Sequence, residues 1–369
     1  MSCFVHKNKS NNPPDLLIVL CHGFQGSNKD FHRLVPAIIK TFIDSNLSVF
    51  IITPRSNVSW PGPWHPTRQG TLPCAERAKT EILNILYTHE DAQSLSSIVV
   101  LGHSFGGIYS RALIKLMKDD SIIPHKLTPL SYISVASPHL GIRWKPGIIT
   151  SIWQFGASIV AGITGEELLL EDSNNENVPL LVQLSSKEYL KSLKLFPNLI
   201  CYGNVYNDLQ VPLCTATIRS KNPYRNKNAL PLDKKYPSVI SMEKENEKNN
   251  IIGSVMEEEE KEEKEEKEEK EEKEEKEEKE ENGDNNKEMF CDNELGEQLR
   301  TIHDNLNSLN WTKVDCICGI DCHNQIIGNY PLWMSKGIDV TVHISNNILH
   351  QYKEAVSNST VTSTILGKK

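Results

Sequence analysis

The chain has 369 residues, of which 38% are hydrophobic, so it is long enough for one large α/β domain with insertions or for two smaller domains. Its formal net charge is −8, but residues 257–281 alone contain 18 Glu and 7 Lys, which leaves 33 basic and 30 acidic residues elsewhere. This near-neutral remainder lacks the basic excess of a nucleic-acid-binding surface, so we expect no nucleic acid partner.

Residues 1–14 are polar and contain no apolar core of signal-peptide length, so we expect a polar N-terminal tail and no secretion by that route. Nine cysteines at irregular spacing then predict reduced thiols in a cytoplasmic chain. Cys316, Cys318, Cys322 and His323 resemble a metal cluster only superficially, because their spacing contains no Cys-x2-Cys pair. We expect neither a metal nor a cofactor.

The first part of the chain alternates between strand and helix patterns. Continuous apolar runs predict strands over residues 16–21, 47–53, 98–101 and 130–136. Helical spacing of apolar residues predicts helices over residues 30–43, 75–89 and 107–117. A loop rich in proline and tryptophan, residues 54–73, interrupts the series. The pattern indicates an α/β fold with a doubly wound, mostly parallel sheet and helices on both faces.

The later part of the chain is less regular. Its patterns predict an amphipathic helix over 180–196, a strand over 199–202, a short strand over 213–218, a helix over 295–309 and a strand over 311–319. Between them, a strict Glu-Glu-Lys repeat places like charges three residues apart and cannot join a core. We therefore predict that residues 240–290 form a disordered or charged-helix insertion. The folded domain is expected over 15–228 and 291–356, followed by a C-terminal tail over 357–369.

The most informative motif is the pentapeptide Gly102-His103-Ser104-Phe105-Gly106, which lies between a buried strand and a helix. That context predicts a nucleophile elbow with Ser104 at its apex. Gly102 and Gly106 are required because a Cβ at either position would collide with the neighbouring strand or helix.

A serine hydroxyl needs a histidine that takes its proton and a carboxylate that orients the histidine. In α/β-hydrolases these groups follow strands in the chain order Ser, Asp or Glu, His, and Asp208 and His323 occupy such positions. Asp233 and Asp315 are weaker candidates for the carboxylate. The other candidates for the base are His303, His343 and His350.

The glycine-rich turn after the first strand predicts half of an oxyanion hole. We expect the backbone N–H groups of Phe24 and Phe105 to stabilise the tetrahedral intermediate. Gly23 belongs to the same turn, and His22 and His103 are expected to brace the two turns by hydrogen bonds.

Five motifs together resemble those of a serine esterase family of lipase-like α/β-hydrolases that was formerly a domain of unknown function. They are Leu20-Cys21-His22-Gly23-Phe24-Gln25-Gly26, Gly102-His103-Ser104-Phe105-Gly106-Gly107, Ala136-Ser137-Pro138-His139-Leu140-Gly141, Asn207-Asp208-x-x-Val211-Pro212 and Cys322-His323-Asn324-x-Ile326-Ile327. The resemblance covers residues 16–219 and 295–342 and implies an esterase or lipase that acts on acyl esters of lipids. It also implies Ser104, Asp208 and His323 as the triad.

Residues 147–165 carry no charge and nearly reach the length of a membrane span, but their polar residues and glycines favour a lid helix, within a cap over about 142–197. Trp153, Phe155 and Ile159 would then contact an acyl chain. We expect a cytoplasmic protein with peripheral contact at membranes or lipid droplets through this lid; the protein partners of the acidic insertion are unknown. A thioesterase or protein deacylase would share the triad, and a non-catalytic interaction protein is the alternative of another class.

Overall fold

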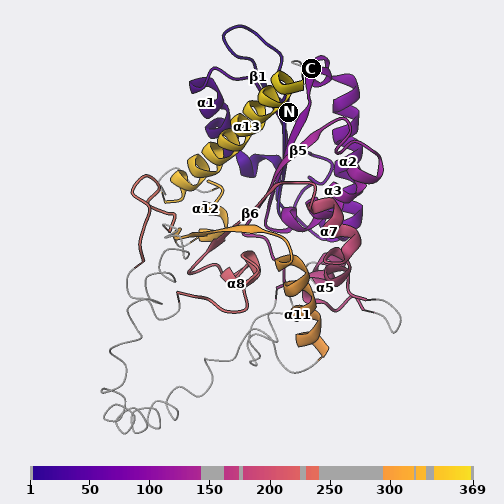
Figure 1. Cartoon of the computed structure of the whole chain (residues 1–369). Coiled ribbons are helices and arrows are strands. Elements are labelled where there is room, and N and C mark those ends of the chain that lie inside the picture. The colour runs from indigo at the N-terminus through magenta and orange to yellow at the C-terminus, as the bar shows by residue number, and fades with distance from the viewer. Residues whose placement is uncertain are drawn as a thin grey trace.

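A computed structural model describes residues 3–142, 162–173, 178–224, 230–240, 294–319, 321–329 and 336–366. The described residues include a seven-stranded sheet with the strand order β1-β3-β2-β4-β5-β6-β7 (Figure 1). Its strands are β1 (Cys3–His6), β2 (Leu16–Cys21), β3 (Val49–Ile52), β4 (Ser97–His103), β5 (Thr128–Val135), β6 (Asn198–Asn204) and β7 (Trp311–Cys316). All neighbouring pairs are parallel except β1, which pairs antiparallel with β3 at the edge.

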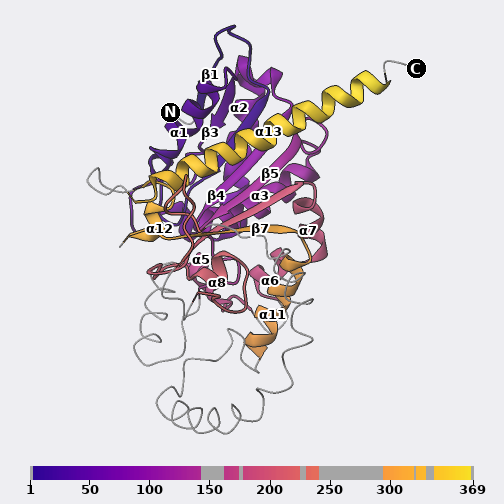
Figure 2. The same ribbon diagram turned by 60° about the vertical axis from the view of Figure 1, so that its left-hand side comes forward.

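Helices cover both faces of the sheet, as Figures 1 and 2 show. One face carries α1 (Leu34–Asp44) and α13 (Ile338–Leu366), and the other carries α2 (Thr71–Thr88), α3 (Phe105–Asp119) and α7 (Lys187–Leu193). Shorter elements are the 3₁₀ helices η1 (Asn28–Phe31), η2 (Pro66–Arg68) and η3 (Glu90–Ser94) and the helices α5 (Ile163–Leu169), α6 (Leu180–Leu184), α8 (Leu213–Ala216), α11 (Glu294–Asn307) and α12 (Cys322–Gln325).

The alternation of side chains along β2 explains why its apolar run is continuous. Leu17 and Val19 join the core beneath α2 and α3, whereas Leu16, Ile18 and Leu20 join the core beneath α1 and α13. Every residue of β2 is fully buried, as expected for a central parallel strand covered on both faces.

Two segments from opposite sides of the acidic insertion lie next to each other in the sheet. β6 precedes the insertion and β7 follows it, and they pair in parallel from Leu199 with Trp311 to Asn204 with Cys316. Beyond β7, α13 buries Val340, Ile344 and Ile348 against the sheet. Segments from before and after the insertion are therefore neighbouring strands of one sheet.

Two predicted elements of the later chain were wrong. Residues 213–218 contain the helix α8 rather than a strand, because Leu213 and Ala216 both pack against Gly203 of β6, which the helical spacing allows. Residues 180–196 form two helices, α6 and α7, rather than one. They are separated at Ser185 and Ser186, and Ser186 has extended backbone angles at the N-cap of α7.

Both expected tails contain regular structure. Residues 3–6 form β1 and cover the edge of β3, and α13 continues to Leu366 across the boundary predicted at residue 357. Residues 147–161 of the lid predicted over 147–165 lie outside the described residues, as do residues 241–290 of the insertion predicted over 240–290. Within the described parts of the chain, no helix is long and apolar enough to cross a membrane.

Candidate active site

Ser104 occupies the sharp turn between β4 and α3. Its φ of 54° and ψ of −130° are a strained combination for a residue with a side chain, and it is the conformation that a nucleophile elbow imposes. A Cβ on Gly102 would collide with the backbone of Gly106 and Gly107, and a Cβ on Gly106 would collide with the carbonyl group of Cys21. The turn can therefore form only with glycine at both positions.

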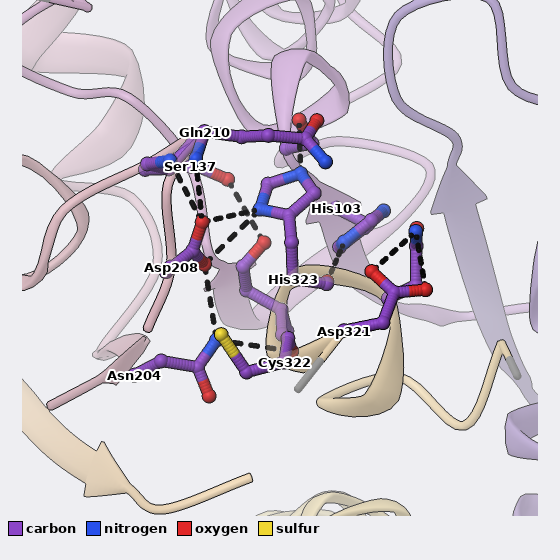
Figure 3. A network of polar contacts seen from close by, with 12 residues as sticks. His103, Ser137, Asn204, Asp208, Gln210, Asp321, Cys322 and His323 are labelled. Atoms are coloured by element: carbon purple, nitrogen blue, oxygen red, sulfur yellow. Dashed lines mark hydrogen bonds and ion pairs between the residues drawn. The ribbon is translucent and has the colours of Figure 1, made fainter. Parts of the chain in front are cut away.

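The side chains of Ser104, His323 and Asp208 make a continuous chain of hydrogen bonds. Ser104 Oγ lies 2.9 Å from His323 Nε2, and His323 Nδ1 lies 3.1 Å from each carboxylate oxygen of Asp208. Figure 3 shows the carboxylate of Asp208 facing the imidazole ring. The three residues follow β4, β6 and β7, whose carboxyl ends meet at one edge of the sheet.

Backbone and amide donors hold the Asp208 carboxylate in place. Its Oδ1 accepts the N–H groups of Gln210 (3.1 Å) and Val211 (2.8 Å), and its Oδ2 accepts the side-chain amide of Asn204 (3.0 Å). Burial alone would raise the pKa of Asp208, but His323 and these donors outweigh it and lower the pKa below its usual value. Asp208 is therefore a carboxylate at neutral pH.

Asn204 also contacts the histidine loop. Its side-chain amide donates to the carbonyl oxygen of Cys322 at 3.1 Å, so one amide connects the carboxylate to the residue before His323 (Figure 3). The sequence patterns gave Asn204 no role. Its position at the last residue of β6, four residues before Asp208, is the only signal that could have identified it.

His103 supports the same loop from the other side. Its Nε2 donates to the carbonyl oxygen of His323 at 2.8 Å (Figure 3), because a carbonyl oxygen can only accept. Burial, followed by the neighbouring imidazole of His323, lowers the pKa of His103 to about 3. A neutral His103 ring therefore holds the backbone of His323.

The turn after β2 lies directly against the elbow. A Cβ added to Gly23 would lie 2.9 Å from Ser104 Cβ, and His22 Nδ1 donates to the carbonyl oxygen of Gly23 at 3.0 Å. Burial lowers the pKa of His22. Among the described residues, no group accepts a hydrogen bond from the backbone N–H of Phe24 or Phe105. Neither donor is therefore used within the described chain.

The alternative residues have other partners. Asp233 accepts the N–H groups of Lys235 and Tyr236, and Asp315 is paired with Arg219 and Tyr224. Among the alternative histidines, His303 contacts Asp304 and His343 contacts Tyr202. The third, His350, contacts Glu354. The structure therefore brings only His323, among these candidates, to Ser104.

The cysteines near the histidine loop are buried thiols. Burial raises the pKa of Cys316 well above its usual value and that of Cys322 to about 12. Across the described ranges, no group of three or more His, Cys, Asp or Glu side chains could hold a metal ion. The predicted lid residues Trp153, Phe155 and Ile159 lie outside those ranges.

Comparison with known proteins gave one family and several relatives. Residues 11–221 match the model of the family described as "Putative serine esterase (DUF676)". Two curated relatives come from Saccharomyces cerevisiae. "Putative lipase YDL109C" is 29% identical over 207 residues, and "Putative lipase ROG1" is 33% identical over 208 residues. Each match covers 55% of this chain but only 30% and 28% of the two yeast proteins, so the chain spans less than a third of their length.

Solved structures were also found. Carboxyl esterase 2 from Tuber melanosporum is 16% identical with a TM-score of 0.36, and the match covers 55% of this chain and 61% of the esterase chain. The mature form of the Bacillus licheniformis lipase BlEst2 is 15% identical with a TM-score of 0.33, and the match covers 60% of this chain and 86% of the lipase chain.

Proposed function

The chain belongs to the DUF676 serine esterase family, and from this we propose that it is a serine hydrolase that cleaves carboxylic acyl esters of lipids through an acyl-enzyme on Ser104. Its fold is that of an α/β-hydrolase, in which such a serine lies at the carboxyl end of a parallel strand. The names of the two yeast relatives, "Putative lipase YDL109C" and "Putative lipase ROG1", support a lipid ester as the substrate.

In the proposed reaction, Ser104 Oγ attacks the ester carbonyl carbon while His323 Nε2 accepts the hydroxyl proton. The carbonyl oxygen becomes an oxyanion, which the N–H groups of Phe24 and Phe105 stabilise. His323 then donates the proton to the leaving alcohol, and the acyl group remains on Ser104. A water molecule, deprotonated by His323, releases the fatty acid and restores the serine.

The single observation that carries this proposal is the uninterrupted contact from Ser104 Oγ to His323 and from His323 to Asp208. The 2.9 Å separation between Ser104 Oγ and His323 Nε2 is within the range for direct proton transfer. Asp208, an anion by its lowered pKa, stabilises the imidazolium that forms.

The proposal is tested by labelling the protein with a fluorophosphonate probe and by assaying a panel of esters of graded chain length. Ser104→Ala should abolish labelling and reduce ester hydrolysis by at least about a thousandfold, because the nucleophile is lost. Ser110→Ala provides the matched control, since Ser110 lies on α3, the helix that follows Ser104, and its buried hydroxyl bonds to Gly107 and Tyr132.

The control variant should be labelled like the wild type. Persistent labelling of a folded Ser104→Ala protein, shown by an unchanged circular dichroism spectrum, would contradict the assignment of the nucleophile.

A further inference from the structure

Two tryptophans on the loop between β3 and α2 are almost fully exposed. Trp60 is 90% exposed and Trp64 is 89% exposed, more than any other large hydrophobic residue among the described parts of the chain. We call residues 54–70 the tryptophan loop. Indole rings are usually at least partly covered in a folded protein, so two exposed ones on the same loop indicate a surface that a membrane or another molecule covers.

The tryptophan loop is firmly held at its base. The N–H groups of Arg55 and Ser56 donate to Glu81 at 2.8 and 2.7 Å. Arg77 donates to the side chain of Asn57 at 2.8 Å and to the carbonyl oxygen of Pro66 at 2.9 Å. Both ends of the loop are thus attached to α2, and Pro61 and Pro63 restrict the segment between them. The exposed indoles are therefore presented by an ordered scaffold.

The loop lies at the catalytic edge of the sheet. It follows the carboxyl end of β3, and Thr67 Oγ1 accepts the N–H of Gln25, one residue beyond Phe24, at 2.9 Å. Other exposed apolar side chains lie at the same edge. Ile163, 53% exposed, approaches Gly70 at the end of the loop, and Leu209, 73% exposed, directly follows Asp208.

The charges of the tryptophan loop favour an anionic partner. The segment contains Arg55 and Arg68 and no Asp or Glu. Its one histidine, His65, is buried and has a lowered pKa, so it adds no charge at neutral pH. Tryptophan and arginine together suit the boundary between lipid headgroups and acyl chains. The indole ring fits there because it is largely apolar but carries one polar N–H group.

We propose that the tryptophan loop anchors the protein on a lipid surface, with Trp60 and Trp64 inserted at the headgroup boundary and the catalytic edge facing the bilayer. This assigns the surface contact to an ordered segment distinct from residues 147–165. The purpose of this binding rests on the proposed function, because it would bring an ester in the lipid surface to Ser104. The binding step itself requires no catalysis.

Binding is measured by co-flotation with vesicles of phosphatidylcholine, with and without a minor fraction of phosphatidylserine. The Ser104→Ala protein serves as the parent so that hydrolysis cannot change the vesicles. Adding Trp60→Ala and Trp64→Ala should weaken vesicle binding by at least about tenfold. Phosphatidylserine should strengthen binding of the parent, because the loop carries arginines without carboxylates.

Tyr87→Ala is the matched control. Tyr87 is an exposed aromatic residue, 63% exposed, near the other end of α2, about 24 Å from Thr71 at 1.5 Å per residue. Its substitution should leave vesicle binding unchanged.

In the catalytically active protein, the double tryptophan variant should hydrolyse a soluble short-chain ester within about twofold of the wild-type rate, and a vesicle-embedded ester at least about tenfold more slowly.

Equal vesicle binding by the parent and the double variant would overturn the proposal, as would a parent that binds no vesicles. A dimer that the double substitution dissociates, without vesicle binding, would assign the indoles to a second copy of the chain instead. If vesicle binding depends on the tryptophans but no ester is cleaved, the proposed hydrolase function is contradicted and lipid binding by the tryptophan loop is supported.

Discussion

His103 connects the nucleophile turn to the loop of His323 through one hydrogen bond. Its ring lies 5.0 Å from that of His323 between centroids, and the low pKa of about 3 keeps it uncharged at neutral pH. A charged ring at this place would oppose formation of the His323 imidazolium. We therefore regard His103 as a positioning residue.

We predict that His103→Ala lowers kcat by about tenfold to a hundredfold with little change in KM, because a small displacement of His323 weakens proton transfer. His103→Gln, whose amide can donate to the same carbonyl oxygen, should recover part of the loss. The measurement is steady-state hydrolysis of a soluble ester, with the pH profile of kcat recorded for both variants.

The acidic limb of that profile should keep its midpoint in His103→Gln, since a pKa of about 3 leaves His103 almost entirely unprotonated above about pH 5. A His103→Ala protein with kcat within about twofold of the wild type would show that the hydrogen bond to His323 is dispensable.

At the scale of elements, the site depends on how closely three turns approach one another. The turn after β2 touches the elbow through Gly23, and the elbow touches β2 through Gly106. On the other side, Thr215 of α8 accepts the N–H of Leu140 and donates to the carbonyl oxygen of Gly141, at 2.9 Å each. The turn after β5 and the helix that follows Asp208 are thereby joined.

We predict that Gly106→Ala destabilises the protein by about 2 kcal/mol or more, because the new methyl group would displace β2 or α3. Gly26→Ala in the neighbouring turn is the matched control, since its Cβ would meet chiefly the carboxylate end of Asp30, which can move. The free energy of unfolding by urea distinguishes the two. A loss no greater than that of Gly26→Ala would contradict the close approach of α3 and β2.

The buried strands and the elbow could be predicted from the sequence because each carries a local signal. The continuous apolar run of β2 and the glycines on either side of Ser104 need no knowledge of distant residues. The helix α8 was mistaken for a strand because the alternation of Leu213, Thr215 and Thr217 fits a strand equally well, and packing on Gly203 decides between them. The contacts of Asn204 with Cys322 and of Thr215 with Leu140 and Gly141 could not be found because these partners lie far away in the sequence.

At the scale of the whole molecule, the sheet joins the two sides of the acidic insertion. β7 pairs with β6 along its whole length, α13 covers the face shared with α1, and Tyr352 donates to Asp15 at 2.6 Å. These contacts hold the described domain together without any residue of 257–281.

We predict that deletion of residues 257–281 leaves the midpoint of thermal unfolding within about 2 °C of the wild type and leaves hydrolysis of a soluble ester unchanged. The remaining linker residues still connect Ile240 with Glu294. Differential scanning fluorimetry and the ester assay provide the measurement. A large fall in the unfolding midpoint would show that the repeat contributes to the folded domain.

The parallel pairing of β6 with β7 also divides the proposed chemistry between two polypeptide halves. The half before the acidic segment carries the alcohol and the carboxylate, and the half after it carries the imidazole. A chain cut within that segment would yield two fragments that are each inert, and the ladder between β6 and β7 and the packing of α13 on the sheet would reunite them. Turnover of an ester would then report that the two pieces had met, which makes this protein a natural template for a split reporter.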